Sequence, residues 1–227
     1  MALSDPQRLA EYVRSLPGFV FYETIDGNYG HIGATVADAI LQANNKYATH
    51  VKPRVNRVLA QYPSSVTTSS MLHLLNSVSA TQFLDWRGED RAERFTQVLD
   101  LFAAEGIEVE SDLRDWLSVD SNLPKLRAIK GIGPKTIDYF KILVRVSTSA
   151  IDRHLLSFLG LAGLAPSGYL HAQSVINATA DILEVDRAYF DHSIWQFMSK
   201  GVASSNAREC PEPEAVPGTS PPATPLH

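Results

Sequence analysis

The sequence predicts an all-α fold, and three observations support this prediction. Apolar residues recur along most of the chain at the three- and four-residue spacing of an amphipathic helix. No segment alternates apolar and polar residues convincingly, as a half-buried strand would. Proline and glycine interrupt the pattern between short helical segments. With 227 residues, of which 44% are hydrophobic, the chain is long enough to bury a core.

The helices are expected between such interruptions. The Ser-Asp-Pro sequence at residues 4–6 marks the start of the first helix, and Pro-Gly at residues 17–18 ends it. The apolar stretch at residues 19–22 is too brief to establish a sheet. Further helices are expected at residues 34–44, 53–62, 71–78, 82–86, 90–104, 112–119, 123–129, 134–146, 153–161, 174–183 and 187–200.

Positive charge is concentrated in two stretches of an acidic chain. The net charge is −5, which argues against a protein that coats nucleic acid with its whole surface. Residues 125–153 nevertheless hold seven lysines and arginines against two aspartates, and residues 46–57 hold four and no acid. This distribution fits a localised site for a polyanion. Uneven charge on a solvated surface is the alternative.

Other features exclude several classes of protein. Cys210 is the one cysteine, so we expect no internal disulfide, no cysteine-only zinc site and no iron–sulfur cluster held within this chain. We expect no cofactor or metal, no membrane segment and no signal peptide, and the sequence indicates no obligate protein partner. These expectations favour an intracellular protein, in the cytoplasm or associated with the nucleoid. Residues 209–227 are proline-rich, lack lysine and arginine, and are expected to form a disordered tail.

The sharpest local signal is the turn Lys130-Gly131-Ile132-Gly133 between two expected helices. Both glycines permit backbone conformations that a Cβ would penalise, and they allow close approach to another surface. Pro134 suits the first position of the next helix, and Ile132 is expected to fill the space between the two helices. The free N–H groups and the positive end of the helix dipole favour an anion there. A plain glycine-capped helix turn is the alternative.

Two motifs occur close together: Gly131-Ile-Gly-Pro-Lys-Thr and, seventeen residues after Lys135, Asp152-Arg-His154. Together they resemble the helix-hairpin-helix (HhH-GPD) DNA glycosylases of the endonuclease III superfamily. In that family a GxGxK hairpin precedes a Val-Asp-x-His segment. Residues 39–42 and 191–195 extend the similarity more weakly. The resemblance implies an enzyme that binds double-stranded DNA and excises a damaged or mismatched base after flipping its nucleotide out of the duplex.

The resemblance also implies an architecture of two helical lobes with a DNA-binding cleft between them. The glycosylase domain is then expected at residues 1–208, with one lobe at about 33–148 and the other formed by 1–32 and 149–205. One departure from the family is evident. Many endonuclease III relatives bind a 4Fe–4S cluster through four cysteines after the last helix, and the corresponding region here, residues 200–210, contains one.

Two residues are candidates for catalysis. Asp152 immediately precedes a helix, where it could act only as an N-cap. A carboxylate there could also stabilise positive charge on the sugar as the base departs, or activate a nucleophile. Lys135 lies in the first helical turn, where the helix terminus and nearby cations favour a neutral amine. In the family, the lysine at this position attacks C1′ and forms a Schiff base, which leads to AP-lyase cleavage by β-elimination. A phosphate contact is the alternative role.

The remaining DNA-binding candidates follow from the hairpin and the resemblance. They are Gln42, Lys130, Gly131, Ile132, Gly133 and His154. In the family the residue at the position of Gln42 fills the space left by the flipped base, although a polar residue near a helix end is common. His154 could orient the turn or contact phosphate, and structural packing is an equal alternative. Asp191 and His192 are interpreted as capping and packing residues, and the three tryptophans as core residues.

The leading hypothesis is a base-excision DNA glycosylase with AP-lyase activity. A monofunctional glycosylase, in which Asp152 activates water, is the second hypothesis. The third is a non-catalytic helix-hairpin-helix DNA-binding protein, since the same hairpin occurs in proteins without base chemistry. The sequence does not indicate which lesion or mismatch is the substrate.

Overall fold

The computed structural model describes residues 3–206, with side chains through residue 200. This part of the chain is all-helical and contains no strand. Its helices are α1 (Asp5–Ser15), α2 (Ile32–Leu41), α3 (Lys52–Gln61), α4 (Thr68–Leu75), α5 (Ala80–Leu84), α6 (Glu89–Ala104), α7 (Glu110–Leu117), α8 (Leu123–Arg127), α9 (Pro134–Leu143), α10 (Arg153–Leu161), α11 (Tyr169–Ile182) and α12 (Arg187–Asn206). A π-helix (Tyr47–Val51) precedes α3, and a 3₁₀ turn (Asp120–Asn122) precedes α8. The predicted tail and Cys210 lie outside the described residues.

Several predicted boundaries differ from those in the structure. The π-helical turn leads directly into α3, so helical structure begins six residues before the predicted start at residue 53. Helix α9 ends at Leu143 because Arg145 adopts a left-handed conformation with φ of 65°. Helix α11 begins at Tyr169, directly after Gly168, which has φ of 153°. Left-handed arginine and π-helical geometry have no strong local sequence signal, so these boundaries depend on the tertiary contacts.

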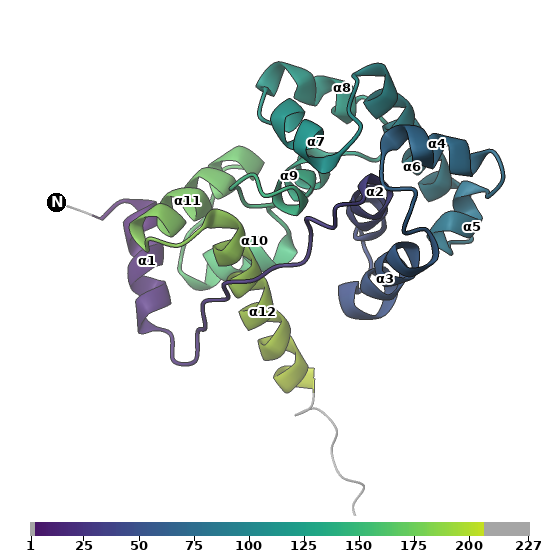
Figure 1. The fold of residues 1–227 in the computed structure, drawn as a ribbon. Coiled ribbons are helices and arrows are strands. Elements are labelled where there is room, and N and C mark those ends of the chain that lie inside the picture. The colour runs from purple at the N-terminus through teal and green to yellow at the C-terminus, as the bar shows by residue number, and fades with distance from the viewer. Residues whose placement is uncertain (1–2, 207–227) are drawn as a thin grey trace, which may run out of the picture.

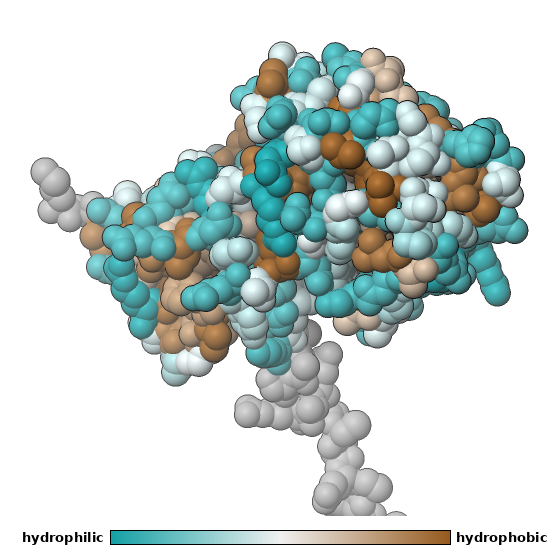
Figure 2. Space-filling view, in the orientation of Figure 1, coloured by the Kyte–Doolittle hydropathy of each residue, from teal (hydrophilic) through white to brown (hydrophobic). Residues whose placement is uncertain are grey.

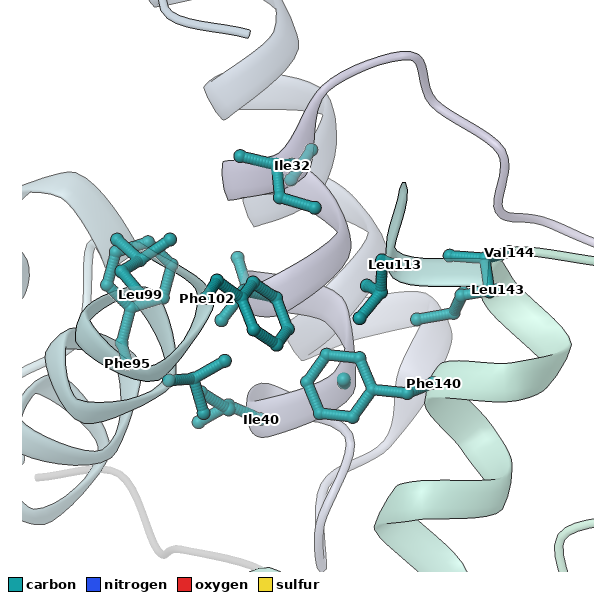
Figure 3. Close-up of a cluster of buried hydrophobic side chains, with 14 of the residues drawn as sticks. Ile32, Ile40, Phe95, Leu99, Phe102, Leu113, Phe140, Leu143 and Val144 are labelled. Atoms are coloured by element: carbon teal, nitrogen blue, oxygen red, sulfur yellow. The ribbon is translucent and has the colours of Figure 1, made fainter. Parts of the chain in front are cut away.

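The larger hydrophobic core belongs to helices α2 to α9. Helix α2 lies at its centre, and every residue from Ile32 to Leu41 is buried. In Figure 3 the side chains of Phe140 and Leu143 from α9 point toward α2. The rings of Phe102 and Phe140 meet edge to face, with centroids 6.3 Å apart. The hairpin before α9 is therefore attached to a rigid core through α9 itself.

A second hydrophobic core is formed by α1 and the C-terminal helices α10 to α12. Phe158 and Phe190 are fully buried in it, and Phe19 from the segment after α1 packs against both rings. Figure 1 shows these four helices grouped on one side, α2 to α8 on the other, and α9 between the two groups. The segment joining α1 to α2 crosses from the first group to the second.

The linker into α2 is held by a buried carboxylate. Glu110 accepts hydrogen bonds from the backbone N–H groups of Tyr29, at 3.0 Å, and Gly30, at 2.9 Å, and another from the Thr35 hydroxyl. The start of α2 is thereby fixed against α7. Figure 2 shows hydrophilic residues over most of one face of the molecule, with smaller hydrophobic patches among them. No helix in the described part of the chain has the length and apolar character needed to cross a membrane.

Candidate nucleic-acid interface and catalytic pair

The turn between α8 and α9 has the hairpin form that the sequence predicts. Ile132 is buried in the larger core, to which Leu126 of α8 and Ile137 of α9 also belong, and its N–H donates to the carbonyl of Ile129 at 3.0 Å. Gly131 has φ of +86°, a conformation that strongly favours glycine. A Cβ at Gly131 would also overlap the guanidinium of Arg94. The backbone conformation therefore favours glycine at this position, and a larger residue would also displace the end of the Arg94 side chain from α6.

The prediction that Gly133 needs a conformation penalised by a Cβ is wrong. Its φ is −103° and its ψ is −179°, an extended conformation open to any residue. Within the described part of the chain, no heavy atom beyond its chain neighbours lies within 4 Å of the place a Cβ would take. Gly133 precedes α9 and offers no side-chain cap, so the N–H groups of the first turn remain available. Among the residues that the structure describes, none fills the space beside Gly133.

Lys135 occupies the second position of α9, immediately after Pro134. Its side chain is partly buried. Within residues 3–200, its amine takes part in no hydrogen bond or ion pair. By contrast, Lys125 on α8 pairs with Glu105 at 2.7 Å. Because no carboxylate neutralises it directly, the Lys135 amine is placed to react or to bind an anion.

Asp152 caps α10 through one carboxylate oxygen. Its Oδ1 accepts the backbone N–H groups of His154, at 2.8 Å, and Leu155, at 3.1 Å. The other oxygen, Oδ2, accepts no hydrogen bond from any residue in the described part of the chain. The predicted N-cap is therefore present, and it leaves half of the carboxylate available. Capping uses Oδ1, so Oδ2 is available for a chemical role.

Lys135 and Asp152 both act electrostatically on Asp191 of α12, which the sequence interpretation assigned to capping and packing. Capping of α12 is done instead by Asp186, which accepts the N–H groups of Ala188 and Tyr189. Asp191 Oδ2 accepts the N–H of Ala150 at 2.7 Å, two residues before Asp152. Asp191 thus anchors the turn that carries Asp152.

The carboxyl of Asp191 has an unusual electrostatic environment. Burial raises its pKa to about 8, with further increases from the charges of Asp152 and Asp138. The Ala150 hydrogen bond and the Lys135 charge act in the opposite direction. Burial also raises the pKa of Asp138, whose Oδ2 accepts a hydrogen bond from the Tyr169 hydroxyl at 2.7 Å. Lys135 acts on Asp191 and Lys141 acts on Asp138, so each acid with a raised pKa has a lysine in its surroundings. Acids with perturbed pKa values are typical of functional sites.

No protein-family model and no curated protein matches this chain. A search of solved structures finds the crystal structure of Tm1821, the 8-oxoguanine DNA glycosylase of Thermotoga maritima. The two chains are 18% identical, with a TM-score of 0.53, and the match covers 85% of this chain and 86% of the other. The chain has the fold of a helix-hairpin-helix DNA glycosylase.

In this glycosylase fold, α12 presents a row of aromatic side chains beside His154. The Trp195 ring lies 6.2 Å from that of His154 and is stacked on His192, also at 6.2 Å. Tyr22 meets His192 edge to face at 5.4 Å, and burial lowers the pKa of His192. Trp195 is partly exposed, so its interpretation as a core residue is wrong. Flat side chains of this kind offer stacking surfaces, and the sequence placed none of them at the site.

Gln42 lies at the C-terminal end of α2, where it is partly buried. One turn earlier, the carboxylate of the buried Asp38 accepts three hydrogen bonds from tyrosine hydroxyls. The donors are Tyr29 at 2.5 Å, Tyr139 at 3.0 Å and Tyr47 at 3.1 Å. Burial raises the Asp38 pKa to about 6, and the three phenol hydrogen bonds oppose that rise. Tyr139 lies one helical turn after Lys135. This cluster therefore links the helix of Gln42 to the helix of Lys135.

A pocket of about 1140 Å³ lies between α8, α9 and the start of α11. Asp138 and Lys141 of α9 contribute to its wall, but Lys135 and Asp152 do not. No group of three or more His, Cys, Asp or Glu side chains within the described residues is arranged to hold a metal ion.

Proposed function

We propose that this protein is a base-excision DNA glycosylase with AP-lyase activity. The observation that supports this most strongly is the pairing of an uncompensated amine, Lys135, with a carboxylate whose Oδ2 is free, Asp152. Both charges act on the carboxyl of Asp191, which supports a shared role for the two residues. A protein that only binds DNA has no need of a carboxylate at such a site, because carboxylates repel phosphate.

Asp152 would stabilise the positive charge that develops on the sugar as the base departs. Its Oδ1 is fixed by two backbone N–H groups, so the position of Oδ2 is set before substrate arrives. Preorganised charge of this kind is more effective than a mobile side chain, because little reorganisation is needed during the reaction.

Lys135 would be the nucleophile. The nitrogen lone pair attacks C1′, and the bonding electrons of the N-glycosidic bond leave with the base, which takes up a proton. Loss of a proton from nitrogen and opening of the sugar ring then give an imine between Lys135 and C1′. Removal of a C2′ proton from this imine expels the 3′ phosphate and cleaves the strand.

DNA would lie between the two helical groups, with the α2–α9 core as one lobe and α1 with α10–α12 as the other. The hairpin from Lys130 to Gly133 would hold a backbone phosphate, and Gln42 would fill the space left by the flipped nucleotide. His154 would contact DNA beside the aromatic row, on which the flipped base could stack. Since the structurally similar protein is named for 8-oxoguanine, we propose that lesion as the first substrate to test.

The free Oδ2 of Asp152 also suits activation of a water molecule, which keeps a monofunctional glycosylase as the second candidate. The two candidates differ in whether an imine forms. Borohydride added during turnover reduces an imine and links protein to DNA covalently.

The deciding experiment incubates the protein with duplexes that each carry one lesion, including 8-oxoguanine and an abasic site, with and without borohydride. We expect base release, a covalent adduct with wild-type protein and no adduct with Lys135→Gln. Lys141→Gln, on the same helix but facing the pocket, is the matched control and should retain the adduct. Excision without an adduct would establish the monofunctional enzyme. Binding without excision or adduct across the panel would favour the non-catalytic module.

A further inference from the structure

Two arginines of α6, one helical turn apart, hold the two chain segments proposed to contact DNA. Arg91 Nη2 donates to the carbonyl of Ala43 at 2.8 Å, immediately after Gln42. Arg94 Nε donates to the carbonyl of Lys130 at 2.7 Å, at the start of the hairpin turn. Helix α6 therefore connects the segment after Gln42 to the hairpin.

The Arg94 guanidinium lies directly against the hairpin. It occupies the space that a Cβ on Gly131 would need. Its Nη1 and Nη2 groups donate no hydrogen bond to any residue in the described part of the chain. The side chain is only partly buried, so these two groups can reach a ligand that approaches the turn.

The charges of the two arginines are not compensated by an ion pair. Within residues 3–200, neither Arg91 nor Arg94 has a carboxylate oxygen within ion-pair distance, whereas Arg54 nearby pairs with Asp85 at 3.5 Å. Burial lowers the pKa of Arg91, and the neighbouring charge of Arg94 lowers it further, although Asp90 opposes this. Two adjacent like charges raise the free energy of the folded protein unless an anion joins them.

We propose that Arg94 binds a phosphate of the DNA backbone together with the hairpin, and that Arg91 strengthens the positive field at that site. Guanidinium groups present a planar pair of donors that matches phosphate, and each such contact displaces counterions from DNA. In this proposal, Lys130 and the N–H groups at the start of α9 contact the same phosphate from the hairpin. This inference rests on the proposed function, since it assigns a further contact to the same DNA.

The test is the salt dependence of binding to an undamaged duplex, compared between wild type and Arg94→Gln. Glutamine keeps an amide N–H donor for the Lys130 carbonyl but removes the charge. We expect weaker binding at low salt, with the slope of log K against log salt smaller in magnitude by about 0.9, the value for one phosphate contact. Arg94→Lys keeps the charge and should retain most of the slope.

Arg8→Gln is the matched control, because Arg8 lies on α1 and pairs with Asp5 at 3.5 Å. It should leave the slope unchanged. Circular dichroism and thermal melting establish that each variant is folded. Weaker binding of Arg94→Gln with an unchanged slope would show that Arg94 only clamps the hairpin and would overturn the inference, as would unchanged binding. If wild type excises a base while Arg94→Gln matches it in affinity and slope, this inference fails and the proposed function stands. If wild type does not bind duplex DNA, both fail.

Discussion

The starts of α9 and α10 are built in opposite ways. Helix α10 is capped by the Asp152 carboxylate, whereas Gly133 before α9 provides no side chain at all. An uncapped start leaves N–H groups and the positive end of the helix dipole available to an external anion. A start capped by Asp152 neutralises them internally and fixes a carboxylate in space. The proposed function accordingly assigns phosphate binding to the α9 start and a reactive carboxylate to the α10 start.

The largest expected effect comes from removing the charge at the α10 start. Asparagine is as good an N-cap as aspartate, so Asp152→Asn should leave the melting temperature nearly unchanged. We expect single-turnover base release to fall by about 10²–10³-fold, because transition-state charge is no longer stabilised. Affinity for the undamaged duplex should persist. A variant that releases base at the wild-type rate would restrict Asp152 to capping.

Asp191 accepts a hydrogen bond from the turn before α10 and interacts electrostatically with Lys135 at the start of α9. Its substitution should change how stability depends on pH. Its folded pKa of about 8 lies above the usual value for an aspartate, so its favourable contribution is complete below pH 4. That contribution is lost as pH rises toward 8, with a slope of at most about 1.4 kcal/mol per pH unit. Asp191→Asn keeps an acceptor for the Ala150 N–H and should become progressively more stable than wild type across this range.

Melting temperatures measured at intervals from pH 4 to pH 9 provide the check on Asp191. The charges of Lys135, Asp138 and Asp152, which act on Asp191, remain in the variant. Parallel curves for wild type and Asp191→Asn would show that the Asp191 carboxyl titrates normally.

Filling the open space at the α9 start should weaken DNA binding without unfolding the protein. Gly133→Val introduces a side chain where this chain has none and where φ of −103° is allowed. We expect duplex affinity to fall by about tenfold, equivalent to about 1.4 kcal/mol, because the phosphate can no longer approach the N–H groups. Gly160→Val, at another open glycine on α10, is the control. Unaltered binding by Gly133→Val would exclude the hairpin as the DNA contact.

The smallest effect is expected at the neighbouring glycine and should be one of stability. Gly131→Ala requires a positive φ and displaces the end of the Arg94 side chain. We expect a loss of about 1 kcal/mol in the free energy of unfolding, measured by urea denaturation. A loss no larger than that of Gly133→Ala would show that the two turn positions do not differ as the backbone angles indicate.

The features that depend on neighbouring residues were predicted from sequence. Helical spacing, the hairpin at Gly131, the burial of Ile132 and the Asp152 cap each follow from a few adjacent residues, because helix periodicity and capping are local. The same local information gave a wrong prediction at Gly133, because glycine can adopt several backbone conformations and here takes an ordinary extended one. Roles of Lys135, Asp152, Gln42, Lys130 and His154 in binding or catalysis remain predictions.

The sequence by itself therefore determined the all-α fold, the position of the hairpin and the identity of two candidate reactive residues. Only the tertiary structure placed Asp191 next to them, set the Arg94 guanidinium against Gly131 and brought Trp195 beside His154. These relations join residues that are 37 to 56 positions apart in the chain or lie on different helices. The physical reason is that burial, electric field and side-chain packing depend on distance in space, and no spacing pattern along one helix encodes them.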